Sequence, residues 1–543
     1  MSRIQLRSAF LGLALLGGGA AGVSHAGVVD GFDGQTIDFT QWRTFSNEHL
    51  PGRTAAVEQI REVDTDQGQA ILGAATTGVS QDVRTALRIR NPGLSGLSGT
   101  VSITEIDRGD GEATIGIAGS YYNAVYSGDP TDSTGEVFAH VRLGDRGDGL
   151  EAWWEIIEST SPDWSAFTVR DNGTLLPPGD VDLGVEYRIG MSHDGETGFA
   201  FSLDGQMQTG EGPPRTTHTR SPLERFAVTL FEGGGNERKM LRGTVSEPTI
   251  AGSPGPYDTF TAARLDPAKW LDFASVRTVD DGRLRLTAQG EGLADSTASF
   301  ARERLILRHF QNPDYFQATV SISDTSELDS GITGRAGLSA FVYNQERDGG
   351  EQADTYNGAE GDVFATIRLQ LQDTTVQAVT YMESVNADYS TREPLMFEQF
   401  PRNLELNTAY TLSIRRIDDQ IIFGLDDETI TYTPGTQMYP PSPAGLDGMR
   451  AVQTEVRGSG SSSPAGAGGI LRGSFANVST EPLSAEPDES APDAGAPEDT
   501  TGNGSSGSSG GCSALGHGGG NEIPVLLLIL MLMIRTTGAF SRR

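Results

Sequence analysis

The sequence predicts an all-β protein built from two tandem antiparallel β-sandwich domains. Apolar and polar residues alternate with a period of two in many short runs, and Asp-Gly and Asn-Gly pairs separate these runs. The chain also contains an internal repeat of about 225 residues. No window combines a helical apolar stripe with helix caps, which argues against a helical or mixed fold.

Residues 1–26 have the features of a secretory signal peptide. Arg3 and Arg7 precede an apolar stretch over residues 9–16, and Ser24 and Ala26 stand where signal peptidase requires small side chains. The apolar stretch is too short, and too interrupted by glycine, for a membrane helix. We therefore predict cleavage after Ala26 and export of the chain.

The internal repeat divides the exported part into two domains. The opening DGFDGQTIDFTQW at 30–42 returns as DTFTAARLDPAKW at 258–270, and later landmarks follow in the same order. We predict domains at 27–252 and 256–482, joined at the Gly-Ser-Pro-Gly-Pro turn. Trp42 and Trp270 recur at a fixed distance from a phenylalanine, so we expect them in the cores. The matched pairs of the opening are Asp30 and Asp258, Phe32 and Phe260, Ile37 and Leu265, Asp38 and Asp266, and Trp42 and Trp270.

Within each repeat the pattern predicts antiparallel hairpins with one buried face. Residues 137–143 are an example, because Val137, Ala139 and Val141 alternate with larger or polar side chains. Many short strands within about 225 residues fit a two-sheet jelly roll better than an immunoglobulin-like sandwich of about 100 residues.

The sequence of the C-terminal part indicates a spacer followed by an anchor. Residues 483–511 are rich in Pro, Gly, Ser and acidic residues, which predicts a disordered linker. In the tail, 512–543, the single cysteine Cys512 precedes a glycine-rich patch, the apolar run 523–534 and Arg535. A helix over that run would be about 18 Å long, short of the ~30 Å hydrocarbon core. We therefore expect a short apolar tail helix that acts as a transient sorting signal.

This tail resembles the C-terminal sorting sequences called MYXO-CTERM, and the related GlyGly-CTERM tails, over about the last 35 residues. The resemblance implies a sorting peptidase as partner, processing near Cys512 and lipid attachment at the new terminus. It predicts a protein anchored at the cell surface or outer membrane, or released from it, that meets the membrane only through this tail.

The charge of the chain excludes one class of partner. Its formal net charge is −33, and a field of that sign repels nucleic acid and anionic membrane surfaces. Nucleic acid is therefore excluded as a partner.

Both repeats resemble concanavalin A-like lectin/glucanase sandwiches, including laminin-G-like ones. The resemblance is carried by the opening Asp-x-Phe, Leu-Asp and Trp pattern, the strand DDGRLRLTA, a Tyr-led hairpin ending in Phe-x-Leu-Asp, and a glycine-led closing strand. It implies a sugar-binding module, a polysaccharide-cleaving enzyme or an adhesion domain, and the fold does not choose among them.

The residues favour a protein without catalytic residues. Laminarinase-type members of that group carry Glu-x-Asp-x-x-Glu on one strand. The nearest match here contains Glu151, Glu155 and Glu158 without an aspartate between them, and Glu158 points to the opposite face of the strand.

The same strand is the best candidate for a ligand site. If Trp154 points to the core, Trp153 lies on the other face between Glu151 and Glu155, and Trp164 in the next loop adds a second ring. An aromatic ring beside hydrogen-bond acceptors suits a sugar ring. The alternative is packing in the core or at the rim of the sheet.

Two further sets of residues have two interpretations each. Tyr122 and Asn123 end a strand, as do Tyr343 and Asn344 in the second repeat, so either they contact a ligand or the asparagine caps a turn. Calcium is the one cofactor suggested, because aspartates in two tight loops offer oxygen ligands, although Asp-Gly turns explain both loops as well. These aspartates are Asp107, Asp110, Asp145 and Asp148.

Three functions follow. The first is an exported, surface-anchored binding or adhesion protein that recognises polysaccharide or glycoconjugate through a sandwich face. The second is a polysaccharide-active hydrolase or lyase with an unrecognised site, and the third is a structural spacer at the cell surface. The residues favour the first.

Overall fold

The computed structural model describes residues 28–481 except 33, 35, 39, 45–57, 77–82, 91–95, 126–127, 130–131, 216–222, 232–237, 294–299, 309–313, 345–360, 386–391, 436–437, 439–448 and 459–465. This part is all-β, which confirms the predicted fold class. The signal peptide with Ala26, the linker and the tail with Cys512 lie outside the described residues. Within the described part, no helix has the length and apolar character needed to span a membrane.

The strands of the first half are β1 (Val28–Asp30), β2 (Trp42–Thr44), β3 (Glu58–Asp64), β4 (Gln69–Thr76), β5 (Val83–Arg88), β6 (Gly96–Asp107), β7 (Ala113–Asn123), β8 (Glu136–Asp145), β9 (Leu150–Ser159), β10 (Phe167–Leu176), β11 (Tyr187–His193), β12 (Gly198–Leu203), β13 (Gln206–Glu211), β14 (Leu223–Leu230) and β15 (Lys239–Ile250). Those of the second half are β16 (Ser275–Asp280), β17 (Arg283–Gly290), β18 (Phe300–Leu307), β19 (Tyr315–Ile322), β20 (Glu327–Leu328), β21 (Ile332–Asn344), β22 (Asp362–Gln372), β23 (Thr375–Val385), β24 (Arg392–Leu404), β25 (Tyr410–Ile417), β26 (Gln420–Leu425), β27 (Glu428–Tyr432), β28 (Arg450–Gly458) and β29 (Gly469–Ser479).

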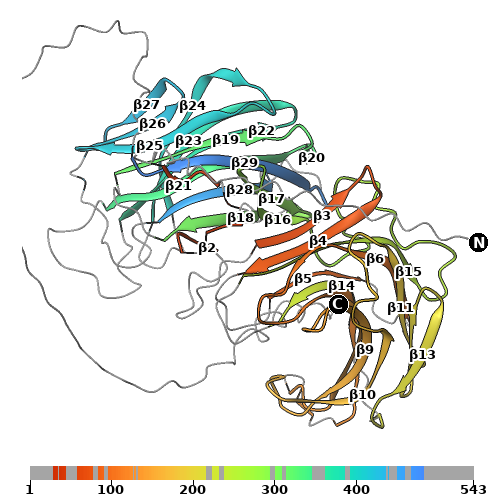
Figure 1. Cartoon of the computed structure of the whole chain (residues 1–543). Coiled ribbons are helices and arrows are strands. Elements are labelled where there is room, and N and C mark those ends of the chain that lie inside the picture. Colours follow the sequence, from red (N-terminus) through yellow and green to blue (C-terminus); the bar gives the residue numbers. More distant parts are fainter. Residues whose placement is uncertain are drawn as a thin grey trace, which may run out of the picture.

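One long antiparallel sheet runs through both halves of the chain (Figure 1). Its main path is β13-β12-β11-β6-β15-β4-β3-β16-β17-β29-β19-β25-β26-β27. At its centre β3 pairs with β16, where Val276 lies opposite Ile60. Outward from this pair the strands follow equivalent orders, so that the hairpin β3–β4 corresponds to β16–β17 and the closing strand β15 corresponds to β29.

A smaller sheet completes a sandwich on each half. The first has the order β10-β9-β8-β7-β14-β5, and the second has the order β2-β18-β28-β21-β22-β23-β24. The predicted alternation on β8 is observed, because Val137, Ala139 and Val141 are fully buried in the first core. Burial of each valine side chain stabilises the fold by about 1.5–3 kcal/mol.

The two opening segments of the repeats are exchanged between the sandwiches. The first opening segment, residues 28–44, places Phe32, Ile37 and Trp42 in the core of the second sandwich. Its strands pair there as well, β1 with β29 and β2 with β18. The second opening segment, residues 256–274, contributes Phe260 and Trp270 to the core of the first sandwich, and Trp270 forms a bridge with Ile89 after β5. Each segment thus packs across the predicted repeat boundary.

The recurring residues of the opening segments form one local structure twice. Asp30 accepts hydrogen bonds from the Phe32 amide (2.7 Å) and from Nε1 of Trp42 (2.6 Å). The Phe32 backbone has a φ of 59°, a left-handed conformation that an aromatic residue rarely adopts. Its ring stacks on Trp42, with 5.7 Å between the ring centroids. In the second segment Asp258 accepts the equivalent bonds. Both tryptophans are fully buried, as the sequence predicted.

Candidate functional site

The candidate site lies on the side of the six-stranded sheet that turns away from the first core, called here the open face. The alternation along β8 places Phe138, His140 and Arg142 on this face. Gly116 of β7 lies opposite Arg142, and a side chain at Gly116 would collide with the backbone oxygen of Val141. Because position 116 carries no side chain, the backbone of β7 forms the surface of the open face beside Arg142.

Trp153 of β9 lies on the open face, as the alternation predicted, whereas Trp154 lies in the core. Trp153 is nevertheless only 2% exposed, because the guanidinium carbon of Arg146 lies 4.2 Å from the centroid of its ring. Arg146 also donates to both carboxylate oxygens of Glu151 (2.7 and 3.0 Å) and lies 3.6 Å from Glu155. The ring thus has a cation over it in this structure, and a role for Trp153 in binding stays a prediction.

The buried His140 pairs with the half-buried Glu155 beside Trp153. Nε2 of His140 lies 3.3 Å from Oε2 of Glu155. Burial, followed by the charge of Arg142, lowers the pKa of His140 to about 3, so the imidazole is neutral near pH 7. Burial raises the pKa of Glu155, but the contact with His140 and the charges of Arg142 and Arg146 outweigh it and lower the pKa overall. Neither pKa lies near neutrality, where a general acid or base works best.

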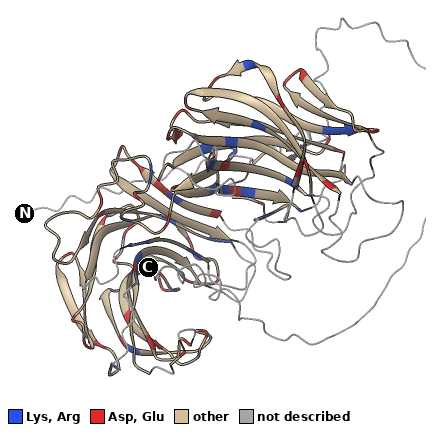
Figure 2. Ribbon diagram, turned by 180° about the vertical axis from the view of Figure 1, so that it is seen from behind, with Lys and Arg blue, Asp and Glu red and all other residues tan. Residues whose placement is uncertain are grey.

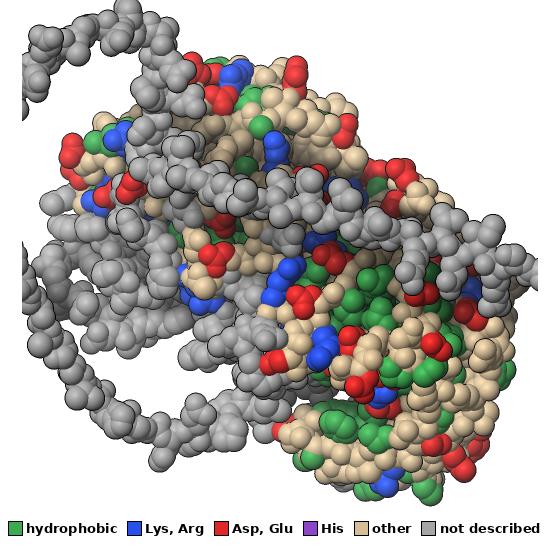
Figure 3. Space-filling view, viewed as in Figure 1, with side chains coloured by type: hydrophobic (Ala, Val, Ile, Leu, Met, Phe, Trp, Pro, Cys, Tyr) green, Lys and Arg blue, Asp and Glu red, His purple; other side chains and the backbone are tan. Residues whose placement is uncertain are grey.

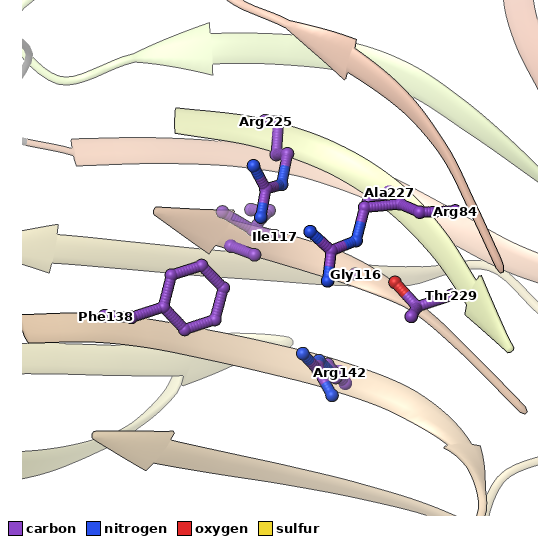
Figure 4. A pocket seen from close by; sticks show the side chains of 9 residues that line it. Arg84, Gly116, Ile117, Phe138, Arg142, Arg225, Ala227 and Thr229 are labelled. Carbon is purple, nitrogen blue, oxygen red and sulfur yellow. The ribbon is translucent and has the colours of Figure 1, made fainter. Parts of the chain in front are cut away.

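Three arginines from three strands meet elsewhere on the open face. Arg84 of β5, Arg142 of β8 and Arg225 of β14 line a small hollow, too narrow to enclose a water molecule, together with Phe138 and Thr229. Their side chains point over the same hollow (Figure 4). We call this cluster the arginine hollow. The sequence did not predict this cluster, because its residues stand on strands that are far apart in the chain, and only the alternation around Arg142 indicated the face.

Arg225 is a cation in the arginine hollow. Burial, and then the charges of Arg84 and Arg142, lower the pKa of Arg225 to about 9, which leaves it protonated at pH 7. Arg142 lies 3.6 Å from a carboxylate oxygen of Glu112, outside the lining of the hollow. The guanidinium carbon of Arg225 lies 5.6 Å from the ring centroid of Phe138. The hollow therefore combines hydrogen-bond donors with an aromatic wall.

Trp164 extends this aromatic wall. Its ring lies edge-on to Phe138, with 6.0 Å between the centroids, and its Nε1 donates to Oε2 of Glu136 (3.1 Å). Trp164 is half-buried and has a φ of 63°. The predicted second aromatic ring thus lies beside Phe138, near the arginine hollow.

The Tyr-Asn pairs lie elsewhere. Tyr122 is buried in the first core, where its hydroxyl donates to the backbone oxygen of Pro213 (2.8 Å). Asn123 is also buried, and Tyr343 belongs to the second core. Asn344 ends β21, opposite Asp362 of β22. Tyr122 and Tyr343 thus pack in the two cores, and contact of either Tyr-Asn pair with a ligand stays a prediction.

Three of the aspartates suggested for calcium have other contacts in this structure, and calcium binding stays a prediction. Asp110 lies 3.2 Å from Nζ of Lys239, and Asp145 lies 3.4 Å from Nε of Arg108. Asp107 accepts the amide of the turn that follows it, and Asp148 is exposed. Over the described ranges, no three His, Cys, Asp or Glu side chains gather as metal ligands would, whereas calcium takes 6–8 oxygens.

The second sandwich carries a different cluster at the equivalent place. Glu455 of β28 is 1% exposed and accepts a hydrogen bond from Nε of Arg302 (3.0 Å). Arg335 and Arg368 each lie 3.7 Å from its other oxygen, and Arg457 lies 3.8 Å from it. Burial raises the pKa of Glu455, but these arginines outweigh it and lower the pKa to about 2. In Figure 2, basic positions of this sandwich lie within its strands.

Comparisons with known proteins find similarities of fold alone. No family model and no curated protein sequence matches it. Among solved structures, it is similar to the CBM2 module of the evolved Dit of Lactobacillus casei BL23 phage J-1, at 15% identity and a TM-score of 0.21, over 38% of this chain and 83% of that one. It is also similar to domains LG4-5 of the mouse laminin alpha1 chain, at 12% identity and a TM-score of 0.20, over 75% and 91%. A third similar structure is porphyranase B from Zobellia galactanivorans, at 11% identity and a TM-score of 0.21, over 37% and 78%.

Proposed function

We propose that this chain is an exported, surface-anchored, non-catalytic protein that binds carbohydrate through the open face of the first sandwich. The observation that carries the proposal is the placement of Phe138 and Trp164 next to the arginine hollow. Aromatic rings pack against the C–H faces of a sugar, and guanidinium groups donate to its hydroxyl oxygens.

Export and anchoring rest on the two ends of the chain. The signal peptide up to Ala26 directs the chain out of the cytoplasm, and a sorting peptidase processes the tail near Cys512. Replacing Cys512 with serine should release the protein from the membrane fraction into the medium. Retention of the C512S variant in the membrane fraction would contradict lipid attachment at this residue.

Carbohydrate binding is tested with the full exported chain on a glycan array, followed by a reducing-sugar assay on each bound glycan. Phe138→Ala and Trp164→Ala should each weaken binding, because each removes part of the aromatic wall. Phe397→Ala is the matched control, because Phe397 is an aromatic residue of the second sandwich that is 61% exposed. Equal binding by all three variants would contradict the proposed face, and release of reducing sugar would indicate a hydrolase instead.

A further inference from the structure

A groove lies on the outer face of the long sheet in the first sandwich, on the opposite side of this sandwich from the open face. It has a volume of about 340 Å³ and lies over β6, β11 and β12, beside the turn that follows β15. Core residues alternate with outward-facing residues on these strands, as Met191 does with Gly190 and Ser192. We call this site the serine groove.

The second sandwich has the same backbone frame at this place. Tyr187 begins β11 and Tyr410 begins β25, and each hydroxyl accepts the backbone amide of the residue five positions earlier. These amides belong to Asp182 and Glu405, and both distances are 2.9 Å. The strands on either side pair in the same register in the two sandwiches. The lining of the groove can therefore be compared position by position.

The second sandwich fills the equivalent space with larger side chains. The ring of Tyr315 is buried there, and its hydroxyl donates to Oε1 of Gln317. Burial raises the pKa of this hydroxyl, although Arg415 and a hydrogen bond with Ser413 oppose the rise. The ring thus lies over Ser413, which stands where the first sandwich has Gly190. Four facing positions carry the smaller residue in the first sandwich, and the pairs are Gly96 and Tyr315, Ser98 and Gln317, Ser192 and Arg415, and Ala200 and Ile422.

The lining of the groove offers hydroxyl groups and no charge. Ser98, Ser192 and Ser202 are half-buried, and no hydrogen bond within the described residues engages their hydroxyls. Met207 of β13 lies opposite Ser202 and is 68% exposed. Acidic and basic side chains are interspersed on the surface drawn in Figure 3, whereas the described lining of the groove contains neither kind.

This chemistry suits an uncharged sugar ring. A charged ligand would lose water in the groove without gaining a partner of opposite charge. A sugar ring carries hydroxyls on several sides and can hydrogen-bond with all three serines, whereas a phenol has a single hydroxyl. Its C–H groups can pack against the apolar side chain of Met207.

We propose that the serine groove binds one uncharged sugar residue of a polysaccharide, in the space that Tyr315 and its neighbours fill in the second sandwich. This inference rests on the proposed carbohydrate-binding function and adds a second site to it. Because the two sites lie on opposite faces of the first sandwich, one molecule can join two polysaccharide strands.

The test uses isothermal titration calorimetry on the full exported chain. The probes are three neutral tetrasaccharides, namely cellotetraose, laminaritetraose and mannotetraose, together with N-acetyltyrosinamide as a phenol. We expect at least one tetrasaccharide to bind, and to bind more tightly than the phenol. Its affinity should stay the same between about 50 and about 200 mM NaCl, because salt screens only interactions between charges.

Two variants address the groove itself. Met207→Ala removes its apolar side, and Ala200→Ile introduces the side chain that the second sandwich carries. Each should weaken tetrasaccharide binding by about ten-fold. Leu183→Ala is the matched control, because Leu183 is an apolar residue of the same sandwich that is 54% exposed and lies outside the groove. All three should keep the melting temperature of the parent protein, because the changed side chains lie outside the core.

Trp164→Ala separates this inference from the proposed function. If W164A loses tetrasaccharide binding while M207A and A200I bind like the parent protein, the groove is overturned and the open face stands. If M207A and A200I weaken binding while W164A does not, the groove is supported and the open face fails. The groove is also overturned if no tetrasaccharide binds, or if N-acetyltyrosinamide binds more tightly than all of them. The glycan array then decides the proposed function by itself.

Discussion

Glu455 is a buried carboxylate whose charge balances the charges of the arginines around it. Its side chain is almost completely buried, and its charge is acceptable there only because Arg302, Arg335, Arg368 and Arg457 surround it. The dependence is mutual, since burial lowers the pKa of Arg368 to about 9 although the charge of Glu455 opposes this change. Removal of the one carboxylate would therefore leave several buried cations without compensation.

The first prediction concerns this carboxylate. Glu455→Gln should lower the free energy of unfolding by about 3–5 kcal/mol, because breaking a buried ion pair leaves uncompensated charge. Equilibrium denaturation in urea measures the change. Glu247→Gln is the control, because Glu247 is 70% exposed and its pair with Arg188 should contribute about 0–1 kcal/mol. Equal stability of E455Q and the parent protein would show that the cluster is compensated in another way.

The second prediction concerns pH. The pKa of Glu455 in the folded protein is about 2, which is below its value in an unfolded chain of about 4.3. The stabilisation from this group is therefore present above about pH 4.3 and is lost as the pH falls towards about 2. Calorimetric melting temperatures should fall more steeply over this range for the parent protein than for E455Q. Parallel curves for the two proteins would contradict the lowered pKa.

At the scale of elements, the opening segments are compact units that each sandwich receives from the other repeat. The first segment is held by more than apolar contact, since the amide of Ile37 donates to Glu58 of β3 (2.6 Å). The second is held in a similar way, since the amide of Leu265 donates to Gln289 of β17 (3.0 Å). Each segment therefore contacts both repeats, and its tryptophan lies in a core that the other repeat builds.

The third prediction follows from this exchange. Trp42→Ala should destabilise the second sandwich, and Trp270→Ala should destabilise the first, each by about 3–5 kcal/mol, because each leaves a large cavity in that core. Hydrogen–deuterium exchange resolved by peptide measures this, with β21 and β28 reporting on one sandwich and β7 and β14 on the other. Each variant is the control for the other. Loss of protection in the first sandwich for Trp42→Ala, or in the second sandwich for Trp270→Ala, would contradict the exchange.

The sequence was sufficient to predict the opening segments but not where they pack. Their Asp, Phe and Trp residues predicted core units correctly, because local hydrogen bonds and stacking produce that pattern. Both segments carry the same pattern, however, so nothing in it distinguishes one core from the other. The open face was predictable in part, because the alternation along the strand placed Trp153 on it correctly. Arg146, which covers the ring of Trp153, lies in a turn, and residues of a turn do not follow the alternation of a strand.

At the scale of the whole molecule, the two sandwiches share a sheet and polar contacts as well as exchanged segments. Beside the β3–β16 pair, Nε of Arg61 donates to the backbone oxygen of Phe273 (2.6 Å). Arg88 forms an ion pair with Asp272 (2.7 Å), and Arg285 forms one with Glu62 (3.0 Å). We therefore expect the part of the chain that folds alone to differ from the half that the repeat boundary defines.

The last prediction tests this with fragments. Fragment 45–274 retains the first core together with Phe260, Leu265 and Trp270, so it should unfold in one cooperative transition. Fragment 27–252 lacks these three buried side chains. Their loss, at about 3–5 kcal/mol for each aromatic residue, is comparable to the total stability of a domain, about 5–15 kcal/mol. We expect no cooperative transition for 27–252 until a peptide of residues 256–274 is added. A cooperative transition without the peptide would mean that segment 28–44 can occupy the first core, and the exchange would then be one of two arrangements open to the chain.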